Sequence, residues 1–274
     1  MVEETIREGH MVIRERPRRV GLIGFGAIGQ PVVELAQRFP DELEIIAACT
    51  RTGIPRRSGV SLSVVGTLDE LLRLRPDVVV EIAGHDALRE HGPHVLTAGI
   101  DLVAVSVGVL AIPEVESDLL SAAQEGGSQI RVASGAIGAL DALAAASIGG
   151  IDRVTHTTRK PARTLLGDEA DGMTEARDVF NGPAREAALV FPESVNVTAA
   201  VSLAGIGFDR TLVRVIADPA VDRNVHSVEA EGEFGSLRFE IRNVPSEDNP
   251  KTGRIVAMSI ISTLRQPWSP LSIG

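Results

Sequence analysis

The sequence predicts an α/β protein with two domains: an N-terminal Rossmann-type, doubly wound parallel sheet, and a second, α+β domain. Residues 18–135 alternate short apolar runs with amphipathic stretches, the pattern of βαβ units whose sheet is covered on both faces. A glycine-rich turn directly follows the first apolar run. From residue 136 the later strand segments instead alternate apolar with polar residues, which is typical of a half-exposed antiparallel sheet.

The first domain is expected to be built from five buried strands with helices between them. The strands are RRVGLIGFG, LEIIAACT, PDVVVEIAG, DLVAVSVG and QIRVASG. The helices are AIGQPVVELAQRF, TLDELLRLR, HDALREHGPHVLTAG and PEVESDLLSAAQEGG. Thr67 and Glu70 have the spacing of a capping box at the start of the second helix.

The second domain is expected to open with a small-residue helix, AIGALDALAAASIGG. Its strands are IDRVTHTTRK, TLVRVIADP, VHSVEAEGEF and SLRFEIRNV, the last two forming a hairpin around Gly235. A polar loop over residues 161–178 and a helix around SVNVTAAVSLAGIG lie between them. The tail NPKTGRIVAMSIISTLRQ has the pattern of one helix that returns to the first domain. The expected division is therefore 18–135 plus 249–274, then 136–248, with 1–17 as an extension.

Composition excludes several classes of function. A net charge of −10 argues against nucleic acid or an anionic membrane as the main partner. The one cysteine, Cys49, rules out an intrachain disulfide and fits a reducing compartment. No apolar run approaches the length that spans a bilayer, and the N-terminus is too polar for a signal peptide. We expect a cytoplasmic protein that acts on a small molecule.

The turn GFGAIG predicts a dinucleotide site because a strand precedes it and a helix follows it. Gly24 permits the tight turn, Gly26 lets the backbone approach a pyrophosphate, and Gly29 lets helix and strand pack closely. Ala27 and Ile28 complete the turn, at the helix N-terminus that would face the phosphates.

The end of the second strand leaves the choice between NAD and NADP open. An NAD-selective site usually has an acidic residue there for the ribose hydroxyl, but this chain has Thr50 and Arg51. Arg51, Arg56 and Arg57 are candidates for binding a 2′-phosphate, or else they lie in a solvated loop. NADP, or use of both cofactors, is permitted.

Histidines supply the candidates for proton transfer. His91 and His94 lie three apart on an expected helix, just after His85, but a zinc site needs three or four converging ligands, and no partner is suitably spaced. We therefore expect no metal. His226 lies near the start of a strand in the second domain, where a neutral imidazole can take a proton near pH 7. From spacing alone, an ordinary surface histidine remains the better interpretation.

Three other polar residues suggest binding. Arg159 and Lys160 end a strand and are candidates for a substrate carboxylate, the alternative being a pair of solvated charges. Asn196 lies in an otherwise apolar, small-residue helix. Because Asn is a poor helix former, its presence there indicates a specific hydrogen bond.

Several segments, in order across both domains, resemble the L-aspartate dehydrogenase family. They are GLIGFGAIG, DLVAVSVGVL, VASGAIGALDAL, TTRKPA, FPESVNVTAAVSLAG, NVHSVEAEGEFG and NPKTGRIVAMSI. The resemblance implies oxidative deamination of L-aspartate with NAD or NADP, giving iminoaspartate, which hydrolyses to oxaloacetate and ammonia. Relatives alternatively supply iminoaspartate to NAD biosynthesis. The resemblance also implies a homodimer formed through the second domain.

The same resemblance assigns roles to residues. His226 falls where the family has its catalytic histidine, and Asn196 where it has a cofactor-contacting Asn. Ala136 falls in the SGAIG turn that the family uses against the nicotinamide. Lys160, and then Arg159, are the candidates for the two substrate carboxylates.

The segment EIAGHDALREHG departs from the family pattern, since a small polar residue is expected where Gly84 and His85 stand. Ala83 and Gly84 are still expected to contact the cofactor, with His85 near the nicotinamide ribose.

Two alternatives to this assignment remain. The first is another oxidoreductase on a similar frame, resembling homoserine dehydrogenase or dihydrodipicolinate reductase. The second is a non-catalytic dinucleotide sensor, which would keep the three glycines of the turn but would not need His226.

Overall fold

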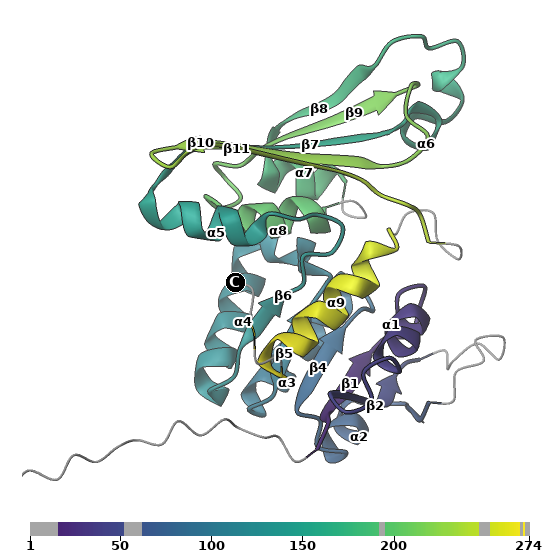
Figure 1. Ribbon diagram of the computed structural model, residues 1–274, viewed down its shortest axis with the longest axis vertical. Helices are drawn as coiled ribbons and strands as arrows, with labels where there is room; N and C mark the ends of the chain where they lie inside the picture. The colour runs from purple at the N-terminus through teal and green to yellow at the C-terminus, as the bar shows by residue number, and fades with distance from the viewer. Residues whose placement is uncertain (1–15, 52–61, 192–194, 247–252, 269–270, 272–274) are drawn as a thin grey trace, which may run out of the picture.

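The computed structural model describes residues 16–51, 62–191, 195–246, 253–268 and 271. Two β-sheets lie one above the other, and three helices of the second sheet lie between them (Figure 1). None of the described helices is both long and apolar enough to cross a membrane.

The first sheet confirms the doubly wound fold. Its six strands are all parallel, in the order β3-β2-β1-β4-β5-β6. They are β1 (Arg18–Ile23), β2 (Leu43–Cys49), β3 (Val64–Val65), β4 (Val78–Glu81), β5 (Asp101–Ala104) and β6 (Ile130–Val132). The order reverses between β1 and β4, and in open α/β sheets ligands bind in the crevice outside the strand ends at that point.

Helices cover both faces of this sheet. One apolar cluster joins it to α1 (Gly29–Ala36) and α9 (Ile255–Arg265). Another joins it to α2 (Leu68–Arg73), α3 (His85–Thr97) and α4 (Pro113–Gly126). The predicted capping box is present at the start of α2. The C-terminal helix does return to pack beside α1 (Figure 1).

The second sheet is mixed, in the order β11-β10-β7-β9-β8. Its strands are β7 (Ile151–Pro161), β8 (Arg177–Pro183), β9 (Leu212–Asp218), β10 (Val225–Gly232) and β11 (Gly235–Arg242). The β10–β11 hairpin is antiparallel, as predicted, whereas β7 and β9 run parallel. Helices α5 (Leu140–Gly149), α7 (Ala184–Val190) and α8 (Asn196–Ala204) lie on the face toward the first sheet (Figure 1).

Some expectations for this region were wrong. The polar stretch 161–178 contains α6 (Ala162–Leu166) and a 3₁₀ turn, η3 (Gly167–Ala170). Strand β8 begins inside the same stretch, at Arg177, and α7 follows β8. The strand β8 escapes sequence reasoning because it is an edge strand whose residues are exposed or half-buried, so no apolar alternation marks it. The last helix begins at Ile255, and the start of its expected segment, 249–252, lies outside the described residues.

A short 3₁₀ helix, η2 (Val107–Ala111), joins the two halves of the molecule. One apolar core runs from α3 and α4 through η2 to α7, α8 and β9. At Gly108 the fit is so close that a Cβ atom would lie 2.2 Å from Val195 Cγ1 and 2.6 Å from His85 Nε2. Only glycine fits there without movement of its neighbours.

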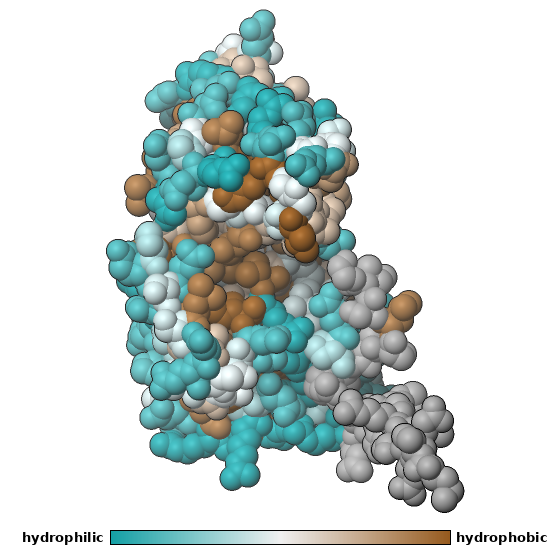
Figure 2. Space-filling model, turned by 90° about the vertical axis from the view of Figure 1, so that its left-hand side faces the viewer, coloured by the Kyte–Doolittle hydropathy of each residue, from teal (hydrophilic) through white to brown (hydrophobic). Residues whose placement is uncertain are grey.

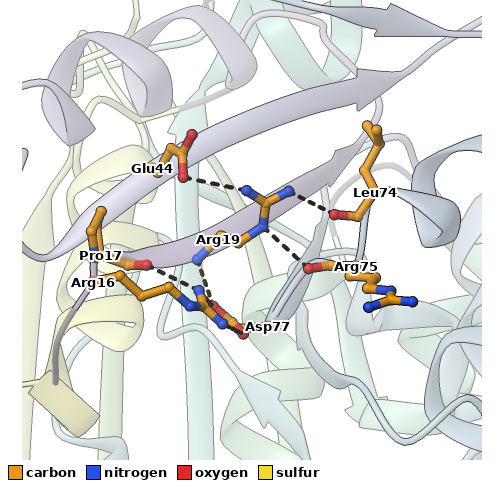
Figure 3. Close-up of polar contacts among 7 residues, drawn as sticks. All are labelled: Arg16, Pro17, Arg19, Glu44, Leu74, Arg75 and Asp77. Carbon is orange, nitrogen blue, oxygen red and sulfur yellow. Dashed lines mark hydrogen bonds and ion pairs between the residues drawn. The ribbon is translucent and has the colours of Figure 1, made fainter.

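A polar network fastens the start of β1 to the loop before β4 (Figure 3). The Arg16 guanidinium donates two hydrogen bonds to the Asp77 carboxylate, at 2.7 and 2.8 Å, and the Arg19 N–H donates a third at 2.8 Å. Partial burial works against ionisation of Asp77, but the bonds from Arg16 and Arg19 outweigh it, so the pKa of this carboxyl is lowered. Its carboxylate therefore stabilises the fold at neutral pH.

We predict that Asp77→Asn lowers the free energy of unfolding at pH 7 by about 1 kcal/mol, the worth of roughly one hydrogen bond. Because the folded-state pKa is lowered, this stabilisation is present above the unfolded-state pKa and is lost as pH falls through the folded-state pKa. Urea denaturation of both proteins at pH 7 and at acid pH measures it, and the difference should shrink in acid. Glu44→Gln is the control, because the Arg19–Glu44 ion pair is longer, at 3.7 Å, and the Glu44 side chain is about half exposed. An equal loss in both variants would contradict the prediction.

Candidate functional site

The glycine turn lies at the carboxyl end of β1, at the point where the strand order reverses. Gly24 has φ +94°, and a Cβ there would lie 2.7 Å from the Ala83 Cβ. A Cβ on Gly26 would meet nothing within 4 Å, so its backbone borders open space. Gly29 opens α1, and a Cβ there would lie 2.9 Å from the Phe25 ring, so this glycine makes room for Phe25. The turn thus has the open backbone and helix N-terminus that a pyrophosphate requires.

The second turn of the crevice follows β4 and is held by a buried carboxylate that sequence reasoning missed. Glu81 is fully buried. Its Oε1 accepts hydrogen bonds from the N–H groups of Ala83 and Gly84, at 2.7 and 2.8 Å. The Ser106 N–H donates to Glu81 Oε2 at 3.1 Å, and the Ser106 hydroxyl donates to Oε1 at 3.0 Å. Burial raises the pKa of Glu81, although these bonds favour its ionised form. The carboxylate ties together the two turns that follow β4 and β5.

The end of β2 forms the third border of the crevice. Thr50 is half-buried and its N–H donates to the Val65 carbonyl, while Arg51 is exposed. Arg56 and Arg57, the other candidates for binding a 2′-phosphate, lie outside the described residues.

Asn196 joins the second sheet's helices to the first half of the molecule. It is the first residue of α8, where the sequence suggested a position inside the helix. Its Oδ1 accepts a hydrogen bond from the Gly108 N–H at 2.9 Å and lies 2.9 Å from His85 Nε2. Since a backbone N–H can only donate, the atom is fixed as the oxygen and His85 Nε2 must carry a hydrogen. The predicted specific hydrogen bond is therefore present, and His85 is one of its donors.

The SGAIG turn is anchored on both sides. The Asn243 amide donates to the Ala136 carbonyl at 3.0 Å, and the Gly135 N–H donates to Ser259 Oγ, on α9, at 3.1 Å. Asn243 follows β11 and is buried. Ala136 is thus held between the C-terminal helix and the second sheet.

His226 lies on the helix-covered face of the second sheet, beside a second histidine that the sequence did not single out. His156 Nε2 lies 3.3 Å from His226 Nδ1, and His156 Nδ1 lies 2.9 Å from Thr198 Oγ1 on α8. Both rings are buried. Burial lowers the pKa of His156 to about 4. Burial, then His156 and Lys160, lower the pKa of His226 well below its ordinary value, so both imidazoles are neutral at pH 7.

Lys160 and Arg159 are separated by the alternation of β7. Thr158 pairs directly with His226 across the sheet, so Lys160, two residues on, shares that face while Arg159 points to the other. Arg159 also forms an ion pair with Asp218 at 3.0 Å. Of the two candidates, the structure brings Lys160 to the His226 side.

His91 and His94 lie on α3, as expected. Within the described ranges, no three histidine, cysteine or acidic residues converge in a way that could hold a metal ion.

Comparison with known proteins decides the family. Residues 24–133 match the homoserine dehydrogenase NAD-binding domain, and residues 141–267 match the aspartate dehydrogenase C-terminal domain. The L-aspartate dehydrogenase of Cupriavidus taiwanensis is 44% identical over 266 residues, covering 93% of this chain and 99% of that protein. The chain belongs to the aspartate dehydrogenase family.

Solved structures agree with this assignment. The crystal structure of aspartate dehydrogenase from Thermotoga maritima superposes with a TM-score of 0.79 at 28% identity, covering 94% of this chain and 99% of that one. A hyperthermophilic archaeal homoserine dehydrogenase, solved with NADPH, has a TM-score of 0.60 at 13% identity, covering 94% and 100%, and so shares the fold alone. As an aspartate dehydrogenase family member, the chain binds NAD or NADP in its first half.

Two glycine substitutions distinguish a role in folding from a role in cofactor binding. We predict that Gly24→Ala costs about 2 kcal/mol of stability, because φ is positive and the added Cβ meets Ala83. Gly26→Ala should leave stability unchanged and weaken NAD(P)H binding about tenfold or more, because its methyl group enters the open side of the turn. Thermal unfolding and fluorescence titration with NADH and NADPH measure the two effects. Unchanged affinity in Gly26→Ala would contradict the assignment of this turn.

Proposed function

We propose that this chain oxidises L-aspartate to iminoaspartate with NAD or NADP, after which water converts the imine to oxaloacetate and ammonia. Family membership over nearly the whole chain supports the substrate, and it favours this reaction over those of homoserine dehydrogenase or dihydrodipicolinate reductase. The observation that carries the chemistry is the buried, neutral His226 beside Lys160. A sensor without catalysis would not need such a group.

His226 acts as the general base in this proposal. An amine must be neutral before hydride departs from its α-carbon, so a neutral imidazole that accepts the proton promotes the reaction. Because burial keeps His226 neutral, its basic form is available throughout the neutral range. Once the imidazolium has released that proton to solvent, the same imidazole takes a proton from the water that attacks the imine carbon.

The cofactor would be held by the turns that border the crevice. The residues proposed for this are Gly24, Gly26, Ala27, Ile28, Gly29, Thr50, Arg51, Ala83, Gly84, Ala136 and Asn196. When bound, the nicotinamide supplies the acceptor for the substrate hydride. Asn196 is suited to orient the nicotinamide. Its Oδ1 already accepts hydrogen bonds from Gly108 and His85, and its Nδ2 donates to none of the described residues. Arg51, exposed at the end of β2, makes NADP acceptable.

Lys160 is our candidate for binding a substrate carboxylate, because it lies on the His226 face of β7 and its positive charge lowers the pKa of His226. Arg159 is a weaker candidate, since Asp218 already neutralises it. Substrate carboxylates near Lys160 would also offset the electrostatic effect of the lysine on His226.

We also propose a homodimer formed through the second domain, taken as residues 136–248, in the cytoplasm. The sequence of α5, LDALAAASIG, is apolar nearly all round, yet only Leu143 and Ala146 are buried and Ile148 is 90% exposed. A helix of this kind is ordinarily covered. Figure 2, seen from the side on which α5 lies in Figure 1, shows hydrophobic residues across the middle of that face.

Light scattering should give twice the 29.0 kDa chain mass, and a monomer would refute the proposal.

Substrate and base are tested together by absorbance at 340 nm. We predict reduction of NAD or NADP with L-aspartate at mildly alkaline pH, with little activity on D-aspartate, glutamate, alanine or homoserine. His226→Ala should lower kcat by about 100-fold or more while NAD(P)H still binds. Preference for glutamate or homoserine would refute the substrate, and a His226→Ala variant of normal kcat would refute the base. No turnover of any amino acid by the wild type would favour a sensor.

A further inference from the structure

Thr198, His156 and His226 form a buried chain of hydrogen-bond contacts. The two histidines in it can adopt either of two tautomers, and the tautomer of His226 affects its proposed role as the base. Each imidazole is neutral and therefore carries one ring hydrogen. The 3.3 Å contact between His156 Nε2 and His226 Nδ1 holds one hydrogen between the two rings. The ring to which that hydrogen is covalently bound determines whether the other nitrogen of His226, Nε2, carries a hydrogen or can accept a proton.

Two arrangements are consistent with the contacts. In one, Thr198 donates to His156 Nδ1, His156 Nε2–H donates to His226 Nδ1, and His226 Nε2 carries a hydrogen and cannot accept a proton. In the other, His156 Nδ1–H donates to Thr198 Oγ1 and His226 Nδ1–H donates to His156 Nε2, so His226 Nε2 has a free electron pair. A threonine hydroxyl permits both, because it donates and accepts.

Protonation of His226 favours the second arrangement. An imidazolium has hydrogens on both nitrogens, so its Nδ1–H needs an acceptor, and only the second arrangement presents His156 Nε2 as one. His156 in turn needs an acceptor for Nδ1–H, which the Thr198 oxygen supplies at 2.9 Å. Since both rings are buried, water cannot replace either partner without cost.

We propose that Thr198 and His156 are positioning residues that hold the proton of His226 on Nδ1 and so keep Nε2 available as the base. This inference rests on the proposed role of His226. Removal of the Thr198 hydroxyl would leave His156 Nδ1–H buried without an acceptor, so His156 would move its hydrogen to Nε2. His226 would then carry its own hydrogen on Nε2, the tautomer that cannot act as a base.

Nitrogen-15 NMR of the histidine-labelled full chain at neutral pH, without substrate, tests the tautomers directly. In the wild type we expect the hydrogen on Nδ1 of both His156 and His226, and in Thr198→Val on Nε2 of both. A wild-type His226 with its hydrogen on Nε2 overturns the proposal. This measurement involves no turnover, so it stands apart from the assignment of the substrate.

Kinetics supply the second test. Thr198→Val should lower kcat for L-aspartate by about tenfold to 100-fold. KM and cofactor affinity should stay within about twofold of wild type, and Thr198→Ser should restore kcat.

Adding Thr198→Val to His156→Phe should cause little further loss of kcat, because both residues act through the same chain of hydrogen bonds to His226. Thr211→Val is the matched control, since Thr211 is fully buried and its hydroxyl has no partner among the described residues. A normal kcat in Thr198→Val overturns the proposal, whereas a wild type inactive on L-aspartate overturns only the proposed function.

Discussion

The close contact at Gly108 is the constraint on which the site depends. Because this residue has no side chain, Val195 and His85 both lie close to its backbone, and its N–H donates to Asn196 Oδ1 at 2.9 Å. The first turn of α8 is thereby fixed against the half of the molecule that contains the glycine turn. Since Thr198 lies in that same turn, the position of α8 also governs the partner of His156 and, through it, the environment of His226.

Both halves of the site contain polar side chains that are buried and hydrogen-bonded. Glu81 is fully buried yet accepts four hydrogen bonds, which hold the turns after β4 and β5. His156 and His226 are buried as neutral rings that satisfy each other. Satisfied networks of this kind rigidify a core but are costly when one member is lost. The site therefore gains a fixed geometry from interactions that also make it sensitive to single substitutions.

The sequence predicted features that local patterns determine. The turn at Gly24, Gly26 and Gly29, the parallel sheet and the β10–β11 hairpin follow from residue type and spacing, and the structure contains them. Asn196 was singled out because Asn is unusual in a helix, but its partners, Gly108 and His85, are 88 and 111 residues away. His156 and Thr198 carried no signal, since their contacts arise from the register of β7 with β10 and from the packing of α8. The role of His226 was inferred from family resemblance, because spacing alone favoured a surface histidine.

The most direct test of this account is the single-turnover rate of cofactor reduction in Gly108→Ala, followed at 340 nm with saturating NAD(P) and L-aspartate. The added Cβ would lie 2.2 Å from Val195 Cγ1 and 2.6 Å from His85 Nε2, so these neighbours of Asn196 must move. A misplacement of about 1 Å is enough to cost roughly 100-fold in rate. Gly66→Ala is the control, because its Cβ would make only an ordinary contact, 3.7 Å from Glu70. We predict a rate about 100-fold below wild type for Gly108→Ala and an unchanged rate for Gly66→Ala. A wild-type rate in Gly108→Ala would contradict the claim that this contact positions the site.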